Sequence, residues 1–396
     1  MKKLVFSLAL LSLVFTSCTS SDDEVTTTPP IATGDITGDI TAAKTYAKGV
    51  YTISGTVRVK SGATLTFEAG SVVTADVTDG ADALLVENGG KLNISGTAAE
   101  PVVFTEKSKT AGSWGGIIMF GDAPIVSGKN TTTGTPITTA TSEDGTNIVY
   151  GGTNATHNGG SLKYVRVEYA GKKILDGNSE MNGFSFYSVG SGTVLENLVA
   201  YKGADDGFEF YGGTVSAKNL ISYGNTDDSF DWQDGWQGQA NTNWYAYQTG
   251  AGNFGMEIEA KSVNNAFFPK VSNITLRRAA GTVTEAGNPL EIDAIQFKKE
   301  GNGEYSNVVI SGYTTANATS VRIQDAATNT NQVLTGKIKM LNVKIADNTT
   351  LWGAGATTFT VAFPTANFTT GTTATGAALT PGAWAIVDGV NLLGNL

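Results

Sequence analysis

The acidic residues that could do chemistry recur at a fixed spacing in the middle of the chain. Residues 205–210 (DDGFEF) and 227–232 (DDSFDW) are offset by 22 positions, and each segment has two aspartates followed by an acid between two aromatic residues. Successive side chains of a strand point to opposite faces, so the aromatic residues share one face and the acid between them points to the other. The acids of the two segments are Asp205, Asp206, Glu209, Asp227, Asp228 and Asp231.

Stacking the two segments as neighbouring strands would bring these carboxylates together. Adjacent strands lie about 4.8 Å apart, so the acids would crowd within about one nanometre, with Asp234 and Glu257 near the edge. Like charges at this spacing raise one another's pKa or recruit a cation, and hard oxygen ligands in a turn-rich segment suit Ca²⁺. We therefore expect a Ca²⁺ site. Two alternatives stay open: solvated acids that serve turn geometry, and a catalytic carboxylate pair.

Aromatic residues follow the acids in a segment rich in Gly, Gln and Asn. Trp236, Trp244 and Tyr245 are candidates for stacking on a sugar ring, beside amide side chains that can hydrogen-bond its hydroxyls. Packing of these rings on the wall of the fold is the alternative.

The elements that must position these residues are short strands in a repeating coil. Residues 183–187 (GFSFY) recur at 207–211 (GFEFY), and residues 197–201 (NLVAY) recur at 219–223 (NLISY). A period of 22 to 24 residues, made of alternating strands and Gly/Asn/Asp turns, is typical of a β-solenoid. The sequence predicts an all-β protein: a right-handed parallel β-helix, single-stranded, with coils of about 22–24 residues, loop insertions and a C-terminal cap.

The same pattern divides the chain into segments. We expect the parallel β-helix over residues 35–345, with 126–161 as an insertion loop off its wall. From residue 346 the pattern decays, and an open solenoid end exposes core and unpaired strand groups, so residues 346–396 are expected to form the cap. An asparagine precedes an apolar strand repeatedly, which predicts a ladder of amide hydrogen bonds between coils. These residues are Asn197, Asn219, Asn273, Asn307 and Asn342.

Composition excludes several kinds of function. The net charge is −10, with 26 Lys+Arg against 36 Asp+Glu, so nucleic acid is not an expected partner. One Cys and one His exclude a disulfide within the chain and a Cys/His zinc site. The single histidine, His157, lies in a Gly/Asn-rich loop, where a solvated bystander is the ordinary interpretation. No residue is assigned a catalytic role.

The N-terminal residues resemble a targeting signal. Residues 1–17 have a basic start and an apolar run too short to span a bilayer, which is typical of a signal peptide. Small residues before Cys18 resemble a bacterial lipobox, which implies cleavage and acylation of Cys18, with palmitate among the lipids. Residues 18–34 predict a flexible acidic and Thr/Pro-rich tether. Their acidic run, Asp22 to Glu24, resembles the export signal of Bacteroidota surface lipoproteins, which implies an outer-membrane anchor facing the extracellular side.

A second resemblance lies at Trp114. Residues 114–118 (WGGII) and 121–125 (GDAPI) are similar to a signature of Bacteroidota surface lipoproteins of the right-handed parallel β-helix type, a family of unassigned function. Packing of Trp114 and stacking of its ring on a sugar both stay open. The resemblance covers most of residues 1–310 and implies fold and location rather than activity.

The function that we expect is binding of glycan or another extracellular surface by a Ca²⁺-stabilised, membrane-anchored β-helix. A Ca²⁺-dependent polysaccharide lyase or glycoside hydrolase is one alternative, and a structural adhesion protein is another. A lyase needs a base, but no recognised lyase motif surrounds the available cations. These are Arg166, Lys202, Lys298, Lys299 and Arg322.

Overall fold

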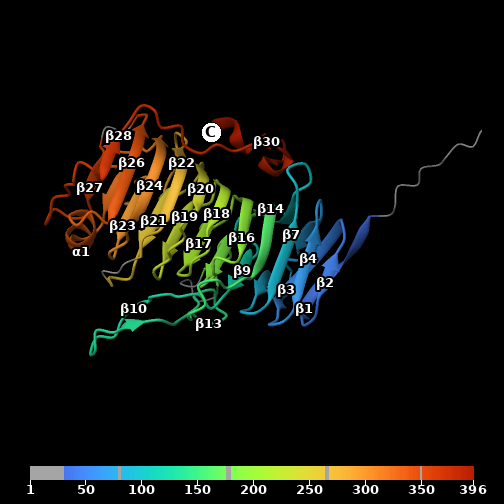
Figure 1. The fold of residues 1–396 in the computed structure, drawn as a ribbon. Helices are drawn as coiled ribbons and strands as arrows, with labels where there is room; N and C mark the ends of the chain where they lie inside the picture. Colours follow the sequence, from blue (N-terminus) through green and yellow to red (C-terminus); the bar gives the residue numbers. More distant parts are fainter. Residues whose placement is uncertain (1–30, 79–81, 175–179, 264–266, 348–349) are drawn as a thin grey trace, which may run out of the picture. The chain divides into compact units, whose positions relative to one another are not determined.

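The computed structural model describes residues 31–78, 82–174, 180–263, 267–347 and 350–396, and Ala32–Leu396 forms one compact unit. Among the described residues, 24 strands join one parallel sheet that winds into a solenoid, so the prediction of an all-β parallel β-helix is confirmed (Figure 1). The predicted signal peptide and Cys18 lie outside the described residues. No helix within the described ranges has the length and apolar character needed to cross a membrane.

Each complete coil contributes one short strand and one longer, bent strand. The short strands pair with one another along the solenoid and form a face that we call stack A. Its strands are β6 (Ala83–Val86), β9 (Ile117–Phe120), β15 (Phe184–Tyr187), β17 (Phe208–Tyr211), β19 (Phe230–Gln233), β21 (Met256–Glu259), β23 (Ile295–Lys298), β25 (Val321–Ile323) and β27 (Trp352–Ala354).

The bent strands make the two other faces: their first halves pair as stack B and their second halves as stack C. They are β14 (Gly160–Glu168), β16 (Val194–Tyr201), β18 (Ala217–Tyr223), β20 (Asn241–Gln248), β22 (Lys270–Arg278), β24 (Gly303–Ser311) and β26 (Ile338–Ile345). The first coils use β1 (Ala32–Ile40), β2 (Lys44–Tyr46), β3 (Gly49–Val59), β4 (Thr64–Glu68), β5 (Val72–Ala75), β7 (Lys91–Ser95) and β8 (Val102–Glu106).

The bend between stacks B and C is formed by one residue with a left-handed backbone conformation. Asn197, Asn219 and Asn243 have φ of 59°, 59° and 60°, a conformation that asparagine tolerates better than most residues. The Asn219 side-chain amide donates to the Asn197 side-chain oxygen at 2.9 Å, and Asn243 donates to Asn219 at 3.0 Å. Asn307 donates to Asn273 at 2.7 Å. The predicted asparagine ladder is confirmed for these pairs, and it includes Asn243, which the sequence pattern missed.

The coils are regular only in the middle of the solenoid. Phe184 pairs with Phe208 and Phe208 with Phe230, offsets of 24 and 22 residues. Further on, Ile274 pairs with Val308, an offset of 34. The predicted coil length therefore holds for the central coils, while the later ones are longer. The extra residues leave the solenoid as loops, such as the one between β22 and β23.

Stacked aromatic rings fill the interior of the central coils. The Phe184 and Phe208 ring centroids are 5.0 Å apart, and those of Phe208 and Phe230 are 5.7 Å apart. Phe210 lies 4.6 Å from Trp236 and 5.8 Å from Trp244. Such pairs add to the stability that burial of the rings provides. The predicted inward face of the repeat is confirmed.

The insertion between β9 and β14 folds against the outer face of stack A. It contains two hairpins, β10 (Gly128–Lys129) with β11 (Pro136–Ile137) and β12 (Ala140–Thr141) with β13 (Val149–Tyr150). Tyr150 packs on Tyr187 and Tyr211, at 5.0 and 6.3 Å between ring centroids. A second apolar cluster thus lies outside the solenoid wall and covers strands β15 and β17.

The C-terminal residues pack near the last coil and then run back along the solenoid. Near the last coil lie α1 (Ala326–Thr328), a π-helical turn (Asn329–Val333) and β28 (Phe368–Thr370). Trp352, Phe363 and Phe368 pack on one another there, with ring centroids 4.8 to 5.3 Å apart. Residues 371–396, the return strap, then run back along the outside of stack C (Figure 1). The strap includes 3₁₀ turns (Ala383–Ala385 and Leu392–Asn395) and the hairpin of β29 (Ile386–Val387) with β30 (Val390–Asn391).

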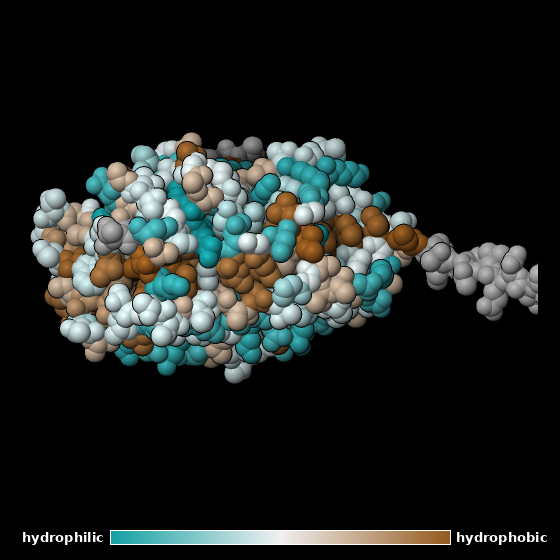
Figure 2. All heavy atoms as spheres, turned by 90° about the horizontal axis from the view of Figure 1, so that it is seen from above, coloured by the Kyte–Doolittle hydropathy of each residue, from teal (hydrophilic) through white to brown (hydrophobic). Residues whose placement is uncertain are grey.

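The return strap buries one apolar side and leaves the other in solvent. Trp384 is 1% exposed and packs edge-on against Tyr164, whereas Ile386 is 46% exposed. Figure 2 looks onto this side of the molecule and shows brown, apolar residues among hydrophilic ones along its length.

Candidate functional site: an acidic hollow on stack A

The acids of the repeat form a column on the outer side of stack A. Ser185 pairs with Glu209, Glu209 with Asp231, and Asp231 with Glu257. The register inferred from the repeat is therefore confirmed, and it extends through Gln296 along the same row. The side chains point away from the aromatic core because they alternate with it along each strand.

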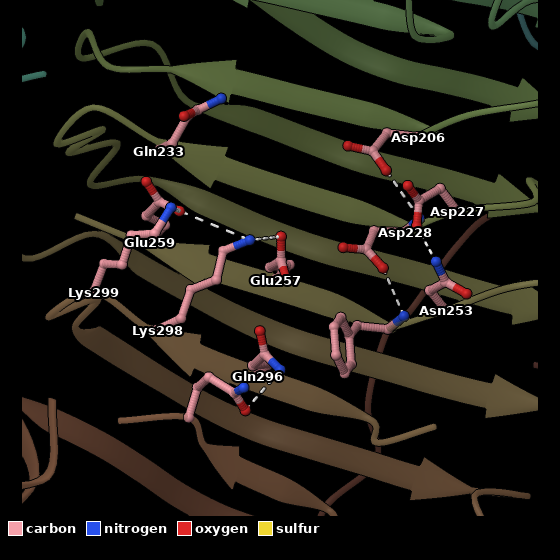
Figure 3. Close-up of polar contacts among 12 residues, drawn as sticks. Asp206, Asp227, Asp228, Gln233, Asn253, Glu257, Glu259, Gln296, Lys298 and Lys299 are labelled. Carbon is pink, nitrogen blue, oxygen red and sulfur yellow. Dashed lines mark hydrogen bonds and ion pairs between the residues drawn. The ribbon is translucent and has the colours of Figure 1, made fainter. Parts of the chain in front are cut away.

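The aspartates that precede the strands form a second row, joined through the backbone. The amide of Asp228 donates to Asp206 Oδ1 at 2.9 Å, and the amide of Phe254 donates to Asp228 Oδ1 at 2.6 Å. The Asn253 side-chain amide donates to Asp227. Figure 3 shows that these contacts link successive coils. Each aspartate thus caps the turn of the next coil, which supplies one structural reason for its position.

These acids face outward from the core, yet they are not solvated. Asp205, Asp206, Glu209 and Asp228 are buried, at 3, 6, 5 and 4% exposure, while Asp227 and Asp231 are half-buried. The insertion closes over them from one side: Glu143 accepts a hydrogen bond from the Tyr211 hydroxyl at 2.7 Å. This coverage argues against the alternative of freely solvated acids that serve turn geometry alone.

The acids surround a small hollow of about 140 Å³. At roughly 30 Å³ for each water in the liquid, it has room for one cation and a few waters. Its lining residues are Glu143, Glu180, Asn182, Asp205, Asp206, Glu209, Asp227, Asp231 and Gln233. Carboxylate oxygens come within 4.8 Å of one another in several groups of three, including Asp206, Glu209 and Asp231. Asp228 belongs to two further groups, one with Asp206 and Asp227 and one with Asp231 and Glu257.

Glu143 and Glu180 line the hollow although neither was predicted. Glu143 comes from the insertion, where it and Asp144 are the only acids in residues 126–161. That isolated acidic pair is the one local signal for its role. Glu180 precedes Asp205 by 25 residues, close to the coil period, and this spacing could have assigned it to the same column.

Burial dominates the electrostatics of the hollow. It raises the pKa of Asp205, Asp206 and Asp228 well above the ordinary range, and the neighbouring carboxylates raise it further. Burial, and then Glu285 and Glu291, raise the pKa of Asp227 to about 7. Because ionised carboxylates are unfavourable in this hollow, binding of a proton or a cation that neutralises them is favourable.

Among the described acids that line the hollow, Glu209 has the most hydrogen-bond donors around it. Asn182 donates to Oε2 at 2.7 Å and Gln233 donates to Oε1 at 2.9 Å, while the Tyr211 hydroxyl, which shares its one proton between Glu209 and Glu143, also contacts Oε2. Burial nonetheless raises its pKa, and Glu143 adds to the effect. Fixed donors on a carboxylate orient it, as the surroundings of metal ligands commonly do.

Lysines flank the acids on the next coils. Lys298 contacts Glu257, and its Nζ lies 3.7 Å from Glu259, as Figure 3 shows. Lys299 and Lys261 also pair with Glu259, at 2.7 and 2.8 Å. Burial alone would lower the pKa of Lys298, but Glu257 and Asp231 raise it, so its ammonium stays charged. Stack A therefore changes from acidic to mixed charge along the solenoid.

A larger hollow of about 750 Å³ continues this face. Glu257 and Lys298 line it, together with Gln296 and Arg322, and Glu257 also belongs to an acidic group with Asp228 and Asp231. Arg322 is already engaged: Nε and Nη2 donate to Asp293 at 2.9 and 3.0 Å, and Nη1 donates to a backbone carbonyl. Glu257 of the larger hollow thus lies in one acidic group with Asp231, which lines the smaller one.

The three predicted ligand-binding aromatics are not exposed, which corrects the expectation. Trp236 Nε1 donates to the carbonyl of Val215 at 2.9 Å, and Trp244 Nε1 donates to that of Ala217 at 3.0 Å, both inside the core. Tyr245 points the other way along β20 and is covered by the return strap. Gly- and Gln-rich sequence around the tryptophans reflects tight corners of the coil rather than an open loop.

Two other sequence interpretations are decided by burial. Trp114 is fully buried and donates to the carbonyl of Glu168 at 2.8 Å, so it packs and does not stack on a ligand. Beside it, Gly116 has φ of 79°, and a Cβ there would lie 2.2 Å from the carbonyl of Asn182. His157, expected to be solvated, is 5% exposed, because Gly121 lets its chain lie against the ring and Gly190 lets its chain lie against the backbone and Cβ of His157.

Comparison with known proteins places the chain in a family. No curated protein matches it, and no solved structure matches it. The family model of the pectate-lyase-like β-helix domain, by contrast, matches residues 34–386, which is nearly the whole described solenoid and its return strap. The chain belongs to the family of pectate-lyase-like β-helix domains.

Proposed function

We propose that this protein is a cell-surface carbohydrate-binding β-helix that takes glycan on stack A and holds Ca²⁺ in the acidic hollow. The observation that carries the proposal is the position of Glu257, which lines the 750 Å³ hollow and lies in one acidic group with Asp231, a residue that lines the acidic hollow. A cation bound among Asp206, Glu209 and Asp231 would therefore lie close to a ligand in the larger hollow. The pectate-lyase-like family description agrees with a carbohydrate-related role.

The donor set suits Ca²⁺ better than the other common ions. It consists of carboxylate and amide oxygens from the coils and the insertion, and the described lining residues include no His or Cys, whose nitrogen and sulfur zinc prefers. Bound Ca²⁺ would supply positive charge that neutralises the buried acids and can coordinate a carboxylate or hydroxyl of a glycan. The chain's own residues would hold it: Asp206, Glu209, Asp227 and Asp231, with Asp205 and Asp228 beside them.

Binding is favoured over cleavage by the state of the nearby cations. Lys298 is held protonated between two glutamates, and the guanidinium of Arg322 is engaged with Asp293. A lyase base must give up its proton near neutral pH, and neither residue is arranged to do so. The same lysine could still neutralise an acidic sugar, which keeps a Ca²⁺-dependent lyase as the second candidate.

The proposal includes the location of the protein at the cell surface. Cys18 would carry the lipid, and the acidic tether after it would lead the β-helix outward from the outer membrane. Labelling cells with a palmitate analogue should mark the wild-type protein and leave Cys18→Ser unlabelled. Protease added to intact cells should digest the β-helix if it faces outward; protection in intact cells would contradict that orientation.

A glycan array probed in Ca²⁺ and in EDTA tests the binding function. We expect a Ca²⁺-dependent component of binding that EDTA weakens at least tenfold and that Asp206→Asn with Asp228→Asn abolishes. The matched control is Asp35→Asn with Asp39→Asn, which removes the same charge from exposed positions of β1. Silence on the array in both conditions would contradict glycan binding and leave adhesion to another surface.

The lyase candidate has its own assay. Incubation with a panel of uronate polymers should give no unsaturated product if the protein only binds. A rise in ultraviolet absorbance that Lys298→Ala removes would establish cleavage instead.

A further inference from the structure

We propose a second glycan site, on stack B, that binds anionic polysaccharide without a metal. Two hollows of about 490 and 290 Å³ lie on the outer side of this stack and share Gln239 and Ala240. Together they make one open groove that crosses strands β16, β18, β20, β22 and β24, and so runs along the solenoid axis. A groove with this direction suits a linear chain.

Charged side chains stand at both ends of the groove in the same arrangement. At one end Glu196 pairs in register with Lys163 on one side and Lys218 on the other. At the other end Glu304 pairs with Lys270 and with Lys339. Each glutamate thus lies between two lysines of adjacent coils, so each triplet has a net charge of +1.

One lysine of each triplet is held by its glutamate and the other is not. Lys163 lies 3.3 Å from Glu196, and Lys339 lies 3.3 Å from Glu304. Among the described residues, Lys218 and Lys270 make no ion pair, and both line the groove. These two ammonium groups are on coils two apart, which is roughly 10 Å along the axis.

The middle of the groove is polar and uncharged. Thr242, Ser272 and Ser306 lie in register across three coils, and Ser272 Oγ lies 3.1 Å from Thr242 Oγ1. Gln237 and Gln239 stand along the side. Hydroxyl and amide groups of this kind form hydrogen bonds with sugar hydroxyls.

The lining favours an anionic glycan over a neutral one. Within the described part of the chain, no aromatic side chain lines either hollow, so this groove lacks the stacking platform that sites for neutral sugars commonly use. Two unpaired ammonium groups in a chain of net charge −10 instead offer carboxylates or sulfates a local positive potential. Stack A has the opposite character, because its acids repel the same ligand unless a cation is bound. The ligand chemistry is therefore a linear glycan that carries carboxylate or sulfate groups.

Binding measured in EDTA separates this site from the metal-dependent one. We expect the wild-type protein to bind an oligogalacturonate or a sulfated oligosaccharide in EDTA, more weakly as salt rises, and a neutral cello-oligosaccharide at least tenfold more weakly. The carboxylate and sulfate arms show which anion is preferred. Lys218→Ala with Lys270→Ala should raise the Kd at least tenfold, and Lys218→Arg with Lys270→Arg should restore it.

Two control variants show whether the effect on binding is specific to the groove. Lys107→Ala with Lys129→Ala removes the same charge from exposed positions away from the groove and should leave the Kd unchanged. Asp35→Asn with Asp39→Asn, at exposed positions of β1, should also leave binding in EDTA unchanged. The inference is overturned if the wild type binds neither anionic probe in EDTA, if the neutral probe binds equally well, or if the two lysine pairs have equal effects in proteins of equal melting temperature.

Discussion

Stacks A and C are outer faces of the same coils, yet stacking has opposite consequences on them. On stack C, Tyr201 lies 5.7 Å from Tyr223, and Tyr223 lies 5.0 Å from Tyr247, under or beside the return strap. On stack A the equivalent repetition places Glu209 over Asp231. A parallel coil brings each residue next to its own kind, so apolar rows gain contacts with every coil while acidic rows accumulate repulsion. Stacking is therefore costly on the acidic face unless a proton or a cation neutralises its carboxylates.

The return strap also changes how the solenoid is held together. In a simple solenoid each coil contacts only its neighbours, so stability is a sum of local terms. Here Arg166 donates to the carbonyls of Ala383 and Ile386, more than 200 residues away in sequence. Asn307 accepts from the amide of Thr375 at 2.7 Å. The strap thus connects late coils with early ones.

The largest effect should come from removing the main anchor of the strap. Trp384→Ala deletes a side chain that is 1% exposed between Tyr164 and the rest of the cluster under the strap, so we expect a loss of about 3–5 kcal/mol in the free energy of unfolding. Urea titration followed by circular dichroism measures it. Ile386→Ala, at a position 46% exposed, should change stability by less than about 0.5 kcal/mol. Equal losses in both variants would mean that the strap is not held by this face.

Ca²⁺ should stabilise stack A by an amount that depends on its acids. At a concentration one hundred times its Kd, a ligand that binds only the folded state adds about 2.7 kcal/mol. We expect Ca²⁺ to raise the melting temperature of the wild type and EDTA to lower it again. Asp206→Asn with Asp228→Asn should remove that response and, in EDTA, make the protein more stable than the wild type, because Asn keeps an acceptor without the charge. A full Ca²⁺ response in this variant would place the ion elsewhere.

Much of this site is readable from the repeat, and the reason is geometric. Register in a parallel stack follows from coil length, so the spacing of residues 205–210 and 227–232 is enough to align Glu209 with Asp231. Alternation along the strand then separates the aromatic core from the acids. The asparagine bends follow from the same period.

What covers the acids could not be read in this way. The insertion has no periodicity, so nothing in its sequence says that β12 and β13 return to the wall and bring Glu143 to the hollow. The expected exposure of Trp236 and Trp244 failed for a related reason. Glycine-rich sequence marks a turn, but whether the turn opens to solvent or folds over the core depends on the neighbouring coils. Long-range contacts of the return strap leave no local pattern at all.

The pH dependence of stability should distinguish the two faces when no metal is bound. Burial raises the pKa of Asp227 to about 7 and that of Asp234 to about 6, so the folded state holds protons that the unfolded state releases near pH 4. Folding stability should therefore fall, not rise, as pH increases from about 4 to 7. Urea unfolding in EDTA at several pH values measures this slope. Added Ca²⁺ should flatten it, and a slope unchanged by Ca²⁺ would contradict cation binding at these acids.

A smaller loss is expected from the polar attachment of the strap. Arg166→Ala removes the bonds to Ala383 and Ile386 and leaves Glu168 buried without its guanidinium partner at 2.9 Å. We expect about 1.5 kcal/mol of destabilisation. Hydrogen exchange should increase in residues 383–388 and not in stack A. Glu196→Ala, which breaks an exposed pair on stack B, is the control and should cost less than about 1 kcal/mol.

Substitutions of Asn219 test why a ladder of stacked amides is stable while a row of stacked carboxylates is not. Asn219 donates to Asn197 and accepts from Asn243, because an amide carries both a donor and an acceptor and can repeat along the stack without a counterion. Carboxylates only accept, so Asp206 and Asp228 rely on backbone amides of the next coil. Asn219→Gly should cost about 1 kcal/mol in unfolding free energy for the lost bonds, since glycine adopts the φ of 59° without strain. Asn219→Ala should cost about 1 kcal/mol more for that strain, and Asn219→Asp should be worse than Gly above pH 5 and improve as the pH is lowered. If Asp were tolerated equally at all pH values, the donor that a carboxylate lacks would not be what makes the amide ladder stable.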